Sequence, residues 1–316
     1  MSSPIKVGIV GATGNTGKSI VNGLLASDVN FEVTALTRPE SVDSDGSKAL
    51  KDRGVKIVIL DLKAPKAELV KALTGLDTVL SCISAYQLEL QAGLAQAAKD
   101  AGVKRFVPCD WGSPAPRGVM LLRDRKDDAL AAVQRLRLAY TVIDVGLWFN
   151  LSVAAVPSGR TAHAVRGILN IHAGDGTVPN ALTDIRDIGW RVARIIADPR
   201  TINKKVFAYT EVLSMNQCAD TLDEVSGEKS VWTELSAQMI HDAIAKAKQE
   251  TSSSALPPGL TINEYYDSCL LRGDNTPESA AYLGYLDFKD LYPEAPSGKL
   301  LGEFYKDVLD GQGIGV

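Results

Sequence analysis

The N-terminal stretch VGIVGATGNTGKSI joins a short apolar run to a glycine-rich turn and then to a helix-length segment. The run, residues 5–10, predicts a buried strand, and the spacing G-x-x-G-x-x-G places Gly11, Gly14 and Gly17 in the turn. In such a unit one glycine permits the tight turn, a second lets a pyrophosphate approach the backbone, and a third lets the helix pack on the strand. The helix N-terminus then offers amides and a positive dipole end to phosphates.

The rest of this turn is expected to contact the same ligand. Thr13, Asn15 and Thr16 lie between or beside the glycines, so we assign them to dinucleotide binding together with Gly11, Gly14 and Gly17. The alternative is a tight turn that holds no ligand. The position of the turn after the first strand of an alternating chain favours the dinucleotide site.

Strand-like apolar runs alternate with helix-length segments through the first half of the chain. The expected strands are 5–10, 31–36, 55–60, 78–83, 105–107 and 140–145. The expected helices are 19–26, 66–73, 88–101 and 121–137. Alternation of this kind predicts a parallel sheet with helices on both faces, and nearly continuous apolar runs fit strands that are covered on both sides. The sequence therefore predicts an α/β fold with a Rossmann-type doubly wound parallel sheet.

The alternating rhythm changes after about residue 150, where prolines and glycines become frequent, and the chain beyond Glu211 has mostly helical patterns. We expect a dinucleotide-binding domain and a smaller, mostly helical C-terminal substrate domain. The expected boundaries are 1–156 with 183–210 returning to it for the first domain, and 157–182 with 211–316 for the second.

Composition excludes several classes of function. The net charge of −4 and the absence of a Lys/Arg run argue against nucleic acid and anionic membranes as partners. No secretory signal is recognisable, and no stretch reaches the roughly 18 apolar residues of a spanning helix. The four cysteines form no C-x-x-C pair and the three histidines no metal-binding pair. We expect a cytoplasmic protein without a metal, a small-molecule substrate as its partner, and a monomer or a homodimer.

The second expected strand predicts which dinucleotide is bound. NAD sites usually place Asp or Glu at the end of this strand, where it binds the ribose 2′-hydroxyl. Here Arg38 stands at that point, and a guanidinium pairs well with a 2′-phosphate. Lys48 adds a second charge further along the same loop. A solvated surface arginine is the alternative, but the location favours NADP(H).

The chemistry is expected beyond the carboxyl ends of the strands. Ser84 and Gly146 follow two of these strands and are assigned to cofactor binding. Trp111, Trp148 and Phe149 are candidates for an apolar wall of the substrate pocket, or equally for core aromatics. A Tyr-x-x-x-Lys pair, typical of short-chain reductases, occurs only at residues 285 and 289, outside the alternating half, and is interpreted as a chance match.

Lys126 interrupts the apolar stripe of the expected helix 121–137, near its start. A lysine that is partly buried among apolar groups loses pKa and serves as a proton donor near neutral pH. The alternative is a surface lysine whose aliphatic stem covers apolar side chains while its ammonium stays in water, and such a lysine would occupy the same position on the helix. Periodicity alone leaves both interpretations open.

Several stretches together resemble the isoflavone reductase-like, NmrA-like family of atypical short-chain dehydrogenases. They are GATGNTGKSI, TRPES, GVKIVILDL, AAKDAGVKRFVPCDWG and YTVIDVGLWF. The segment VPCDWG is more similar to the sequences of fungal members than to those of plant members. The resemblance implies a Rossmann domain, a smaller substrate domain, NADPH, and an essential lysine at the position of Lys126, which would also position the cofactor ribose.

The resemblance also implies a substrate class and an alternative function. Plant members reduce carbon–carbon double bonds or open benzylic ethers of phenylpropanoids and isoflavonoids, whereas NmrA-like regulators bind NADP without evident turnover. This chain departs from the plant pattern at residues 109–112 (Cys-Asp-Trp-Gly for Ser-Glu-Phe-Gly) and at Arg123 (for phenylalanine). We therefore expect an NADPH-dependent reductase of a small aromatic molecule with Lys126 as proton donor, and an NADP(H)-binding sensor as the alternative.

Overall fold

The computed structural model describes residues 3–250 and 256–312, which fall into two compact units. The first unit contains the chain up to Asp110, then Arg125–Ile143 and Ile188–Val206. The second contains Trp111–Asp124, Asp144–Asp187 and the chain from Phe207 onward. The domain boundaries expected from the sequence differ from these units in placing 111–124, 144–156, 183–187 and 207–210 with the dinucleotide-binding domain, and they stay a prediction.

The first unit is built on a parallel sheet with the strand order β3-β2-β1-β4-β5. Its strands are β1 (Ile5–Val10), β2 (Phe31–Thr37), β3 (Lys56–Ile59), β4 (Thr78–Ser81) and β5 (Arg105–Val107). A parallel bridge between Phe106 and Tyr140 leads from β5 to β6 (Thr141–Asp144), which pairs with β10 (Lys204–Phe207). The order reverses at β1, as in doubly wound sheets, so β1 and β4 end beside the switch point where such folds bind ligands.

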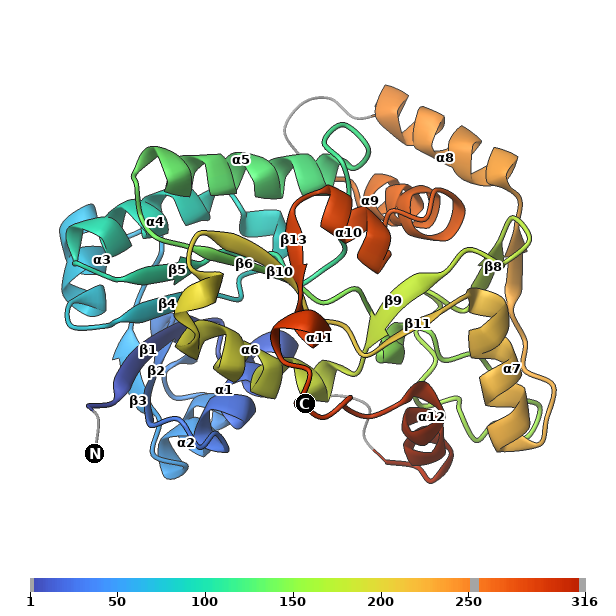
Figure 1. Cartoon of the computed structure of the whole chain (residues 1–316), viewed down its shortest axis with the longest axis horizontal. Helices are drawn as coiled ribbons and strands as arrows, with labels where there is room; N and C mark the ends of the chain where they lie inside the picture. Colours follow the sequence, from blue (N-terminus) through green and yellow to red (C-terminus); the bar gives the residue numbers. More distant parts are fainter. Residues whose placement is uncertain (1–2, 251–255, 313–316) are drawn as a thin grey trace. The chain divides into compact units, whose positions relative to one another are not determined.

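Helices cover both faces of this sheet (Figure 1). They are α1 (Asn15–Leu25), α2 (Asp45–Asp52), α3 (Lys66–Leu73), α4 (Leu90–Asp100), α5 (Leu121–Arg135) and α6 (Ile188–Ala197). The helices α3, α4 and α5 lie on one face, and α1, α2 and α6 on the other. The predicted α/β class with a Rossmann-type sheet is confirmed. The expected and observed bounds coincide for β1, β5 and α3.

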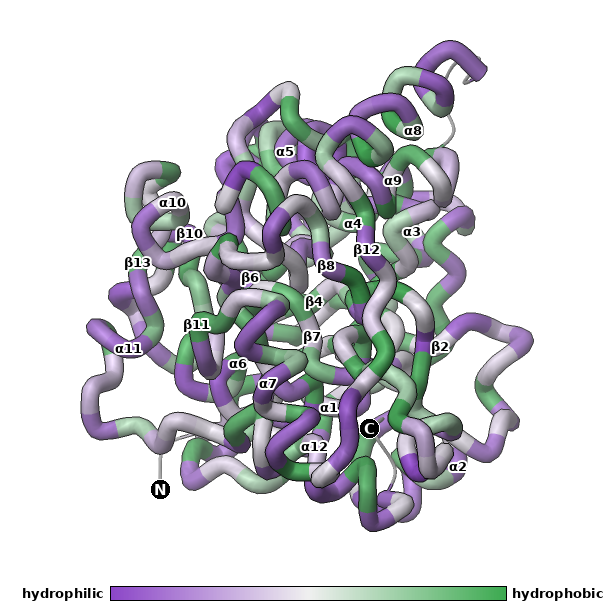
Figure 2. Tube along the Cα trace, turned by 90° about the vertical axis from the view of Figure 1, so that its right-hand side faces the viewer, coloured by the Kyte–Doolittle hydropathy of each residue, from purple (hydrophilic) through white to green (hydrophobic). Residues whose placement is uncertain are grey.

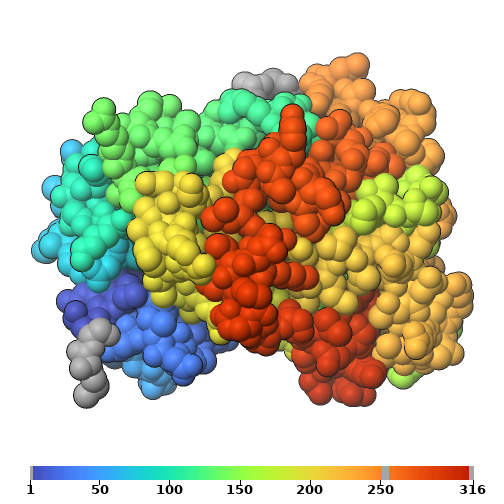
Figure 3. Space-filling view, in the orientation of Figure 1, coloured from blue at the N-terminus to red at the C-terminus, as the bar shows by residue number. Residues whose placement is uncertain are grey.

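The segment 188–206 returns to the first unit, where α6 packs closely on α1. A Cβ atom added to Gly23 would lie 2.0 Å from the carbonyl carbon of Gly189, so only glycine allows this approach. The backbone amide of Gly189 also donates to the hydroxyl of Ser19 at 3.0 Å. Figure 3 shows the yellow segment 188–206 against the surface of the chain's first half.

The second unit combines short strands with helices around its own apolar core. Its strands are β7 (Leu147–Trp148), β8 (Ile171–Ala173), β9 (Asn180–Thr183), β11 (Glu211–Leu213), β12 (Thr233–Leu235) and β13 (Tyr285–Asp287). Its helices are α7 (Met215–Ser226), α8 (Ala237–Glu250), α9 (Pro258–Tyr265), α10 (Pro277–Tyr282), α11 (Phe288–Leu291) and α12 (Leu301–Leu309), with a π-helical stretch Tyr266–Leu271. Helix α8 buries Ile240 and carries both hydrophilic and hydrophobic turns in Figure 2.

Local sequence explains where two helices begin. Helix α1 begins at Asn15, four residues before the expected start, because Gly14 is extended (φ −76°, ψ 167°) and ends the glycine turn. Helix α2 was not expected from periodicity. It begins after Ser44, whose hydroxyl accepts a hydrogen bond from the backbone amide of Ser47 at 3.2 Å.

Candidate active site

The three glycines of the first turn have different structural roles. Gly11 has a φ of 78°, and an added Cβ would lie 2.4 Å from the carbonyl oxygen of Cys82. An added Cβ at Gly17 would lie 2.1 Å from the carbonyl oxygen of Gly11. At Gly14 the nearest atom would be 3.4 Å away, at ordinary contact distance. The fold itself therefore requires Gly11 and Gly17 but leaves open space beside Gly14, which is where a ligand needs a bare backbone.

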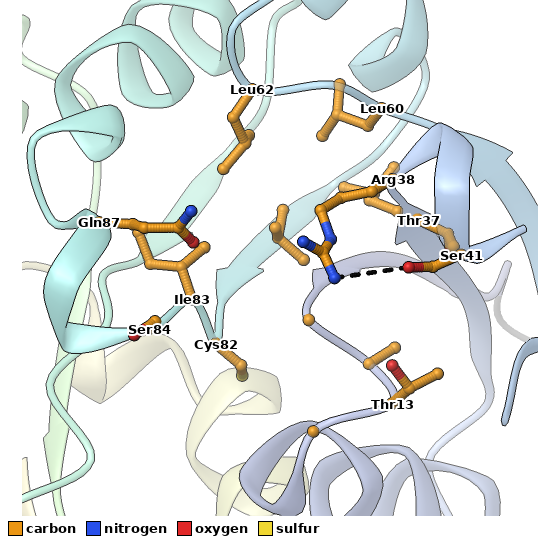
Figure 4. Close-up of a pocket in the computed structure, with 15 residues that line it drawn as sticks. Thr13, Thr37, Arg38, Ser41, Leu60, Leu62, Cys82, Ile83, Ser84 and Gln87 are labelled. Atoms are coloured by element: carbon orange, nitrogen blue, oxygen red, sulfur yellow. Dashed lines mark hydrogen bonds between the residues drawn. The ribbon is translucent and has the colours of Figure 1, made fainter. Parts of the chain in front are cut away.

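This open space belongs to a pocket of about 330 Å³ beside the glycine turn (Figure 4). The lining residues come from the glycine turn and from the ends of four neighbouring strands, with the short segments that follow them: Val10, Gly11, Ala12, Thr13, Gly14, Leu36, Thr37, Arg38, Ser41, Leu60, Leu62, Cys82, Ile83, Ser84 and Gln87. A pocket at the carboxyl ends of β1, β2, β3 and β4, with the N-terminus of α1 beside it, can hold the phosphates of a dinucleotide.

Arg38 directly follows β2 and, among the described residues that line the pocket, is the one with a charged side chain. Its guanidinium extends toward the pocket and donates to the hydroxyl of Ser41 at 3.5 Å (Figure 4). A second contact, 3.2 Å to the carboxylate of Glu40, is largely exposed to solvent. Exposed pairs of this kind are weak, so the guanidinium can turn to a phosphate at little cost.

Of the other residues that the sequence analysis assigned to the cofactor, some line this pocket and others do not. Ser84 lines it, and its hydroxyl accepts a hydrogen bond from the amide of Tyr86 at 3.3 Å. Asn15 and Thr16 form the first turn of α1, whose amides have no acceptor within the helix. Lys48 lies on α2 with its ammonium 3.7 Å from Asp45, and it does not line the pocket.

Sequence reasoning missed several lining residues, including Thr37, Ser41, Leu60, Cys82 and Gln87. Most of them follow the ends of strands, so the rule that locates ligands beyond strand ends is the signal that identifies them. Burial raises the pKa of the Cys82 thiol well above its usual value, with the nearby Cys109 as a smaller cause. The thiol is therefore neutral and does not repel phosphates.

Lys126 lies on α5 with 6% of its surface exposed. Its neighbours on the expected apolar stripe, Leu130 and Val133, are buried as well. The ammonium donates a hydrogen bond to the backbone carbonyl of Asp110, the residue before Trp111. A snorkelling lysine keeps its charged end in water, so this burial does not fit that alternative, and the catalytic role of Lys126 stays a prediction.

The aromatic candidates differ in their surroundings. Trp111 is 5% exposed, and Trp148 is half-buried in β7. Phe149 is fully buried, with its ring 5.7 Å from that of Phe304, which is the position of a core residue. Gly146 has a φ of 74°, and an added Cβ would lie 2.3 Å from the carbonyl oxygen of Ala181, so packing against β9 accounts for this glycine.

The chance match at residues 285 and 289 does not form a catalytic pair. The hydroxyl of Tyr285 donates to the carboxylate of Asp144 at 2.6 Å. The ammonium of Lys289 instead donates to the carbonyl of Thr210 at 3.0 Å and lies 4.3 Å from the ring centre of Tyr209. The two side chains therefore serve different partners.

The described part of the chain has no group of three or more His, Cys, Asp or Glu side chains arranged to hold a metal ion. Over the same residues, no helix combines the length and the apolar character that crossing a membrane demands.

Comparison with known proteins identifies the family. The model of the NmrA-like family matches residues 4–256. The chain belongs to this family. Asnovolin J 5′,6′-dehydrogenase nvfM of Aspergillus novofumigatus is 43% identical to this NmrA-like protein, with 98% of this chain and 97% of the relative covered. Pinoresinol reductase 1 of Arabidopsis thaliana is 29% identical over 90% of this chain and 93% of its own length. The resemblance to the isoflavone reductase-like, NmrA-like family, with a fungal member among the relatives, is confirmed.

Solved structures of related fold agree with this assignment. A crystal structure of isoflavone reductase matches with a TM-score of 0.79 at 22% identity, covering 96% of this chain and 99% of the other. The complex of leucoanthocyanidin reductase with NADPH from Vitis vinifera matches with the same score at 21% identity and the same coverage. At this identity the comparison shows the fold.

Proposed function

We propose that this NmrA-like protein is an NADPH-dependent reductase of a small aromatic molecule, of the phenylpropanoid or isoflavonoid kind, with Lys126 as proton donor. The observation that carries the proposal is the burial of Lys126, whose ammonium is held by a backbone carbonyl. A protein that only senses NADP(H) needs no buried proton donor. The dehydrogenase and reductase names of the relatives support turnover.

The cofactor assignment rests on the pocket of the first unit. Gly14 leaves the backbone accessible to a pyrophosphate, and the N-terminus of α1 supplies amides for it. Arg38 supplies a positive charge where NAD sites place a carboxylate, so the pocket favours the additional 2′-phosphate of NADPH. The NADPH complex of the leucoanthocyanidin reductase, which has the same fold, is consistent with this assignment.

NADPH supplies a hydride when it is bound. Reduction of a carbon–carbon double bond conjugated to a carbonyl also consumes one proton, because the electron pair that the hydride displaces moves onto the carbonyl oxygen. The Lys126 ammonium delivers this proton, directly or through a water, and is reprotonated by solvent. Its hydrogen bond to the carbonyl of Asp110 holds the ammonium in place.

The relatives suggest which bonds to test. The name of nvfM describes a dehydrogenation at a 5′,6′ position, and the reverse of dehydrogenation is reduction of the corresponding double bond. The name of the Arabidopsis relative describes reduction of pinoresinol. Enones, ketones and benzylic ethers of phenylpropanoid-like molecules are therefore the appropriate substrate panel.

The experiment measures NADPH oxidation by the wild-type protein over this panel, with product identification by mass spectrometry. We expect at least one member to be reduced. A protein that binds NADPH and oxidises it with no member of a broad panel would contradict the reductase proposal and favour the sensor.

A further inference from the structure

A buried carboxylate in the second unit accepts hydrogen bonds from three sides. Asp144, at the end of β6, is fully buried. One of its oxygens accepts from the backbone amide of Gly112 at 3.0 Å. The other accepts from the guanidinium of Arg123 at 3.0 Å and from the hydroxyl of Tyr285 at 2.6 Å. Arg123 and Tyr285 are themselves 3% and 7% exposed.

These contacts hold a backbone turn in an unfavourable conformation. Trp111 has a φ of 46°, in the left-handed region that a bulky side chain rarely adopts. The next residue, Gly112, has both its backbone amide and its backbone carbonyl hydrogen-bonded. Its amide donates to Asp144, and its carbonyl accepts from the amides of Val145 and Gly146, each at 2.9 Å. Strain of this kind persists only where surrounding contacts determine the conformation.

A contribution to folding stability does not explain why Arg123 and Asp144 form a buried ion pair. Burial of two charges costs desolvation free energy that their attraction roughly offsets, and a well-packed apolar pair often serves stability equally well. The plant pattern has an apolar residue at the position of Arg123. What the ionic cluster adds is a fixed direction for the amide of Gly112, which an apolar pair does not supply.

We propose that Asp144, Arg123 and Tyr285 are positioning residues that hold the turn at Trp111 and Gly112, and thereby place the carbonyl of Asp110 that accepts the hydrogen bond of Lys126. Asp110 and Gly112 are separated by a single residue, so the conformation of Trp111 determines the direction of the Asp110 carbonyl. The catalytic consequence rests on the proposed function, whereas the structural part does not.

The test compares two buried tyrosines whose hydroxyls each donate to a carboxylate. Tyr285→Phe removes one hydroxyl from Asp144 and is milder than replacing Asp144, which would also remove the carboxylate that pairs with Arg123. Tyr209→Phe is the control, because Tyr209 is also buried and donates to a carboxylate, that of Asp287, at 2.9 Å. Hydrogen–deuterium exchange of the Gly112 amide is measured for both variants and the wild type, each saturated with NADPH.

We expect exchange at Gly112 to be faster by about three- to tenfold in Tyr285→Phe and unchanged in Tyr209→Phe. Equal exchange in all three proteins would overturn the proposal, whatever the protein reduces. This readout needs no turnover, so it is independent of the reductase proposal.

Kinetics with a panel member that the wild type reduces test the link to Lys126. We expect Tyr285→Phe to lower kcat by about tenfold with the Kd for NADPH within about twofold, and Tyr209→Phe to change neither. A merely structural role would lower the unfolding midpoint without this separation of kcat from Kd. Faster exchange at Gly112 with an unchanged kcat would overturn the catalytic link to Lys126 and leave the structural part, which exchange alone tests.

Discussion

The nucleotide pocket and the turn at Trp111 and Gly112 are built in contrasting ways. The pocket is lined by residues from the first 87 of the chain, and its charged group, Arg38, is largely exposed. The turn is held by buried side chains that are distant in sequence, such as Tyr285, which lies 141 residues from Asp144. The proposed cofactor site therefore draws on the N-terminal part of the chain, whereas the proposed positioning of Lys126 draws on contacts between residues far apart in sequence.

Because the two regions are built differently, mutations in them should have different effects. Variants in the pocket should change NADPH affinity and leave the fold intact. Variants around Lys126 should change turnover and leave affinity nearly intact. The following predictions test that separation, beginning with the largest effect.

Lys126→Ala should lower kcat by about 10²–10⁴-fold, because loss of a positioned general acid costs that much, with only a modest loss of NADPH affinity. Lys126→Arg should not restore full activity, since a guanidinium keeps its proton near neutral pH. Steady-state NADPH oxidation and a fluorescence titration of NADPH measure the two quantities. If Lys126→Ala matches the wild type in kcat, Lys126 is a structural lysine.

Gly14→Val should fold yet lose NADPH affinity by about a hundredfold or more, because the side chain fills the space that a pyrophosphate needs. Gly17→Val is the matched control. Its side chain would collide with the carbonyl of Gly11, so this variant should fail to fold. Circular dichroism and NADPH titration distinguish the two. Retained affinity in Gly14→Val would mean that this glycine serves only the turn.

Arg38→Ala should weaken NADPH binding by about ten- to a hundredfold and leave NADH binding within about twofold, because the guanidinium contacts only the additional phosphate. Arg53→Ala removes an exposed arginine that does not line the pocket and should change neither affinity. Both cofactors are titrated by fluorescence. An equal loss of NADPH and NADH affinity would contradict the role given to Arg38.

Lys48→Ala should have the smallest effect, about twofold or less on NADPH affinity at physiological ionic strength. Its exposed ammonium lies outside the pocket lining, and salt screens such charges. Titration at low and at physiological salt measures this effect. A tenfold loss at physiological salt would place Lys48 beside Arg38 as a phosphate ligand.

The same contrast explains how much the sequence predicted. The strands and the glycine turn were predictable because apolar periodicity and turn chemistry are local signals, and the bounds of β1 and β5 coincide with expectation. Lys126 was identified by its interruption of an apolar stripe. Its acceptor, the Asp110 carbonyl, was not predictable, because a backbone group leaves no trace in residue type.

The cluster around Asp144 could not be predicted from the sequence, for a related reason. Arg123 was noted as a departure from the plant pattern, and Tyr285 as half of a chance match. Nothing local to either residue indicates that both would meet one carboxylate. Pairing of distant side chains depends on the tertiary fold, which periodicity along the chain does not encode.

The most direct test of the central claim, reduction by a hydride from NADPH and a proton that exchanges with solvent, is isotope transfer. The wild-type protein is given a panel substrate and NADPH that carries deuterium at the transferred position of the nicotinamide, in ordinary water. The account predicts a reduced product with a single deuterium on carbon, and a second hydrogen that becomes deuterium only when the solvent is heavy water. A reduced product without deuterium from the nicotinamide would contradict the account.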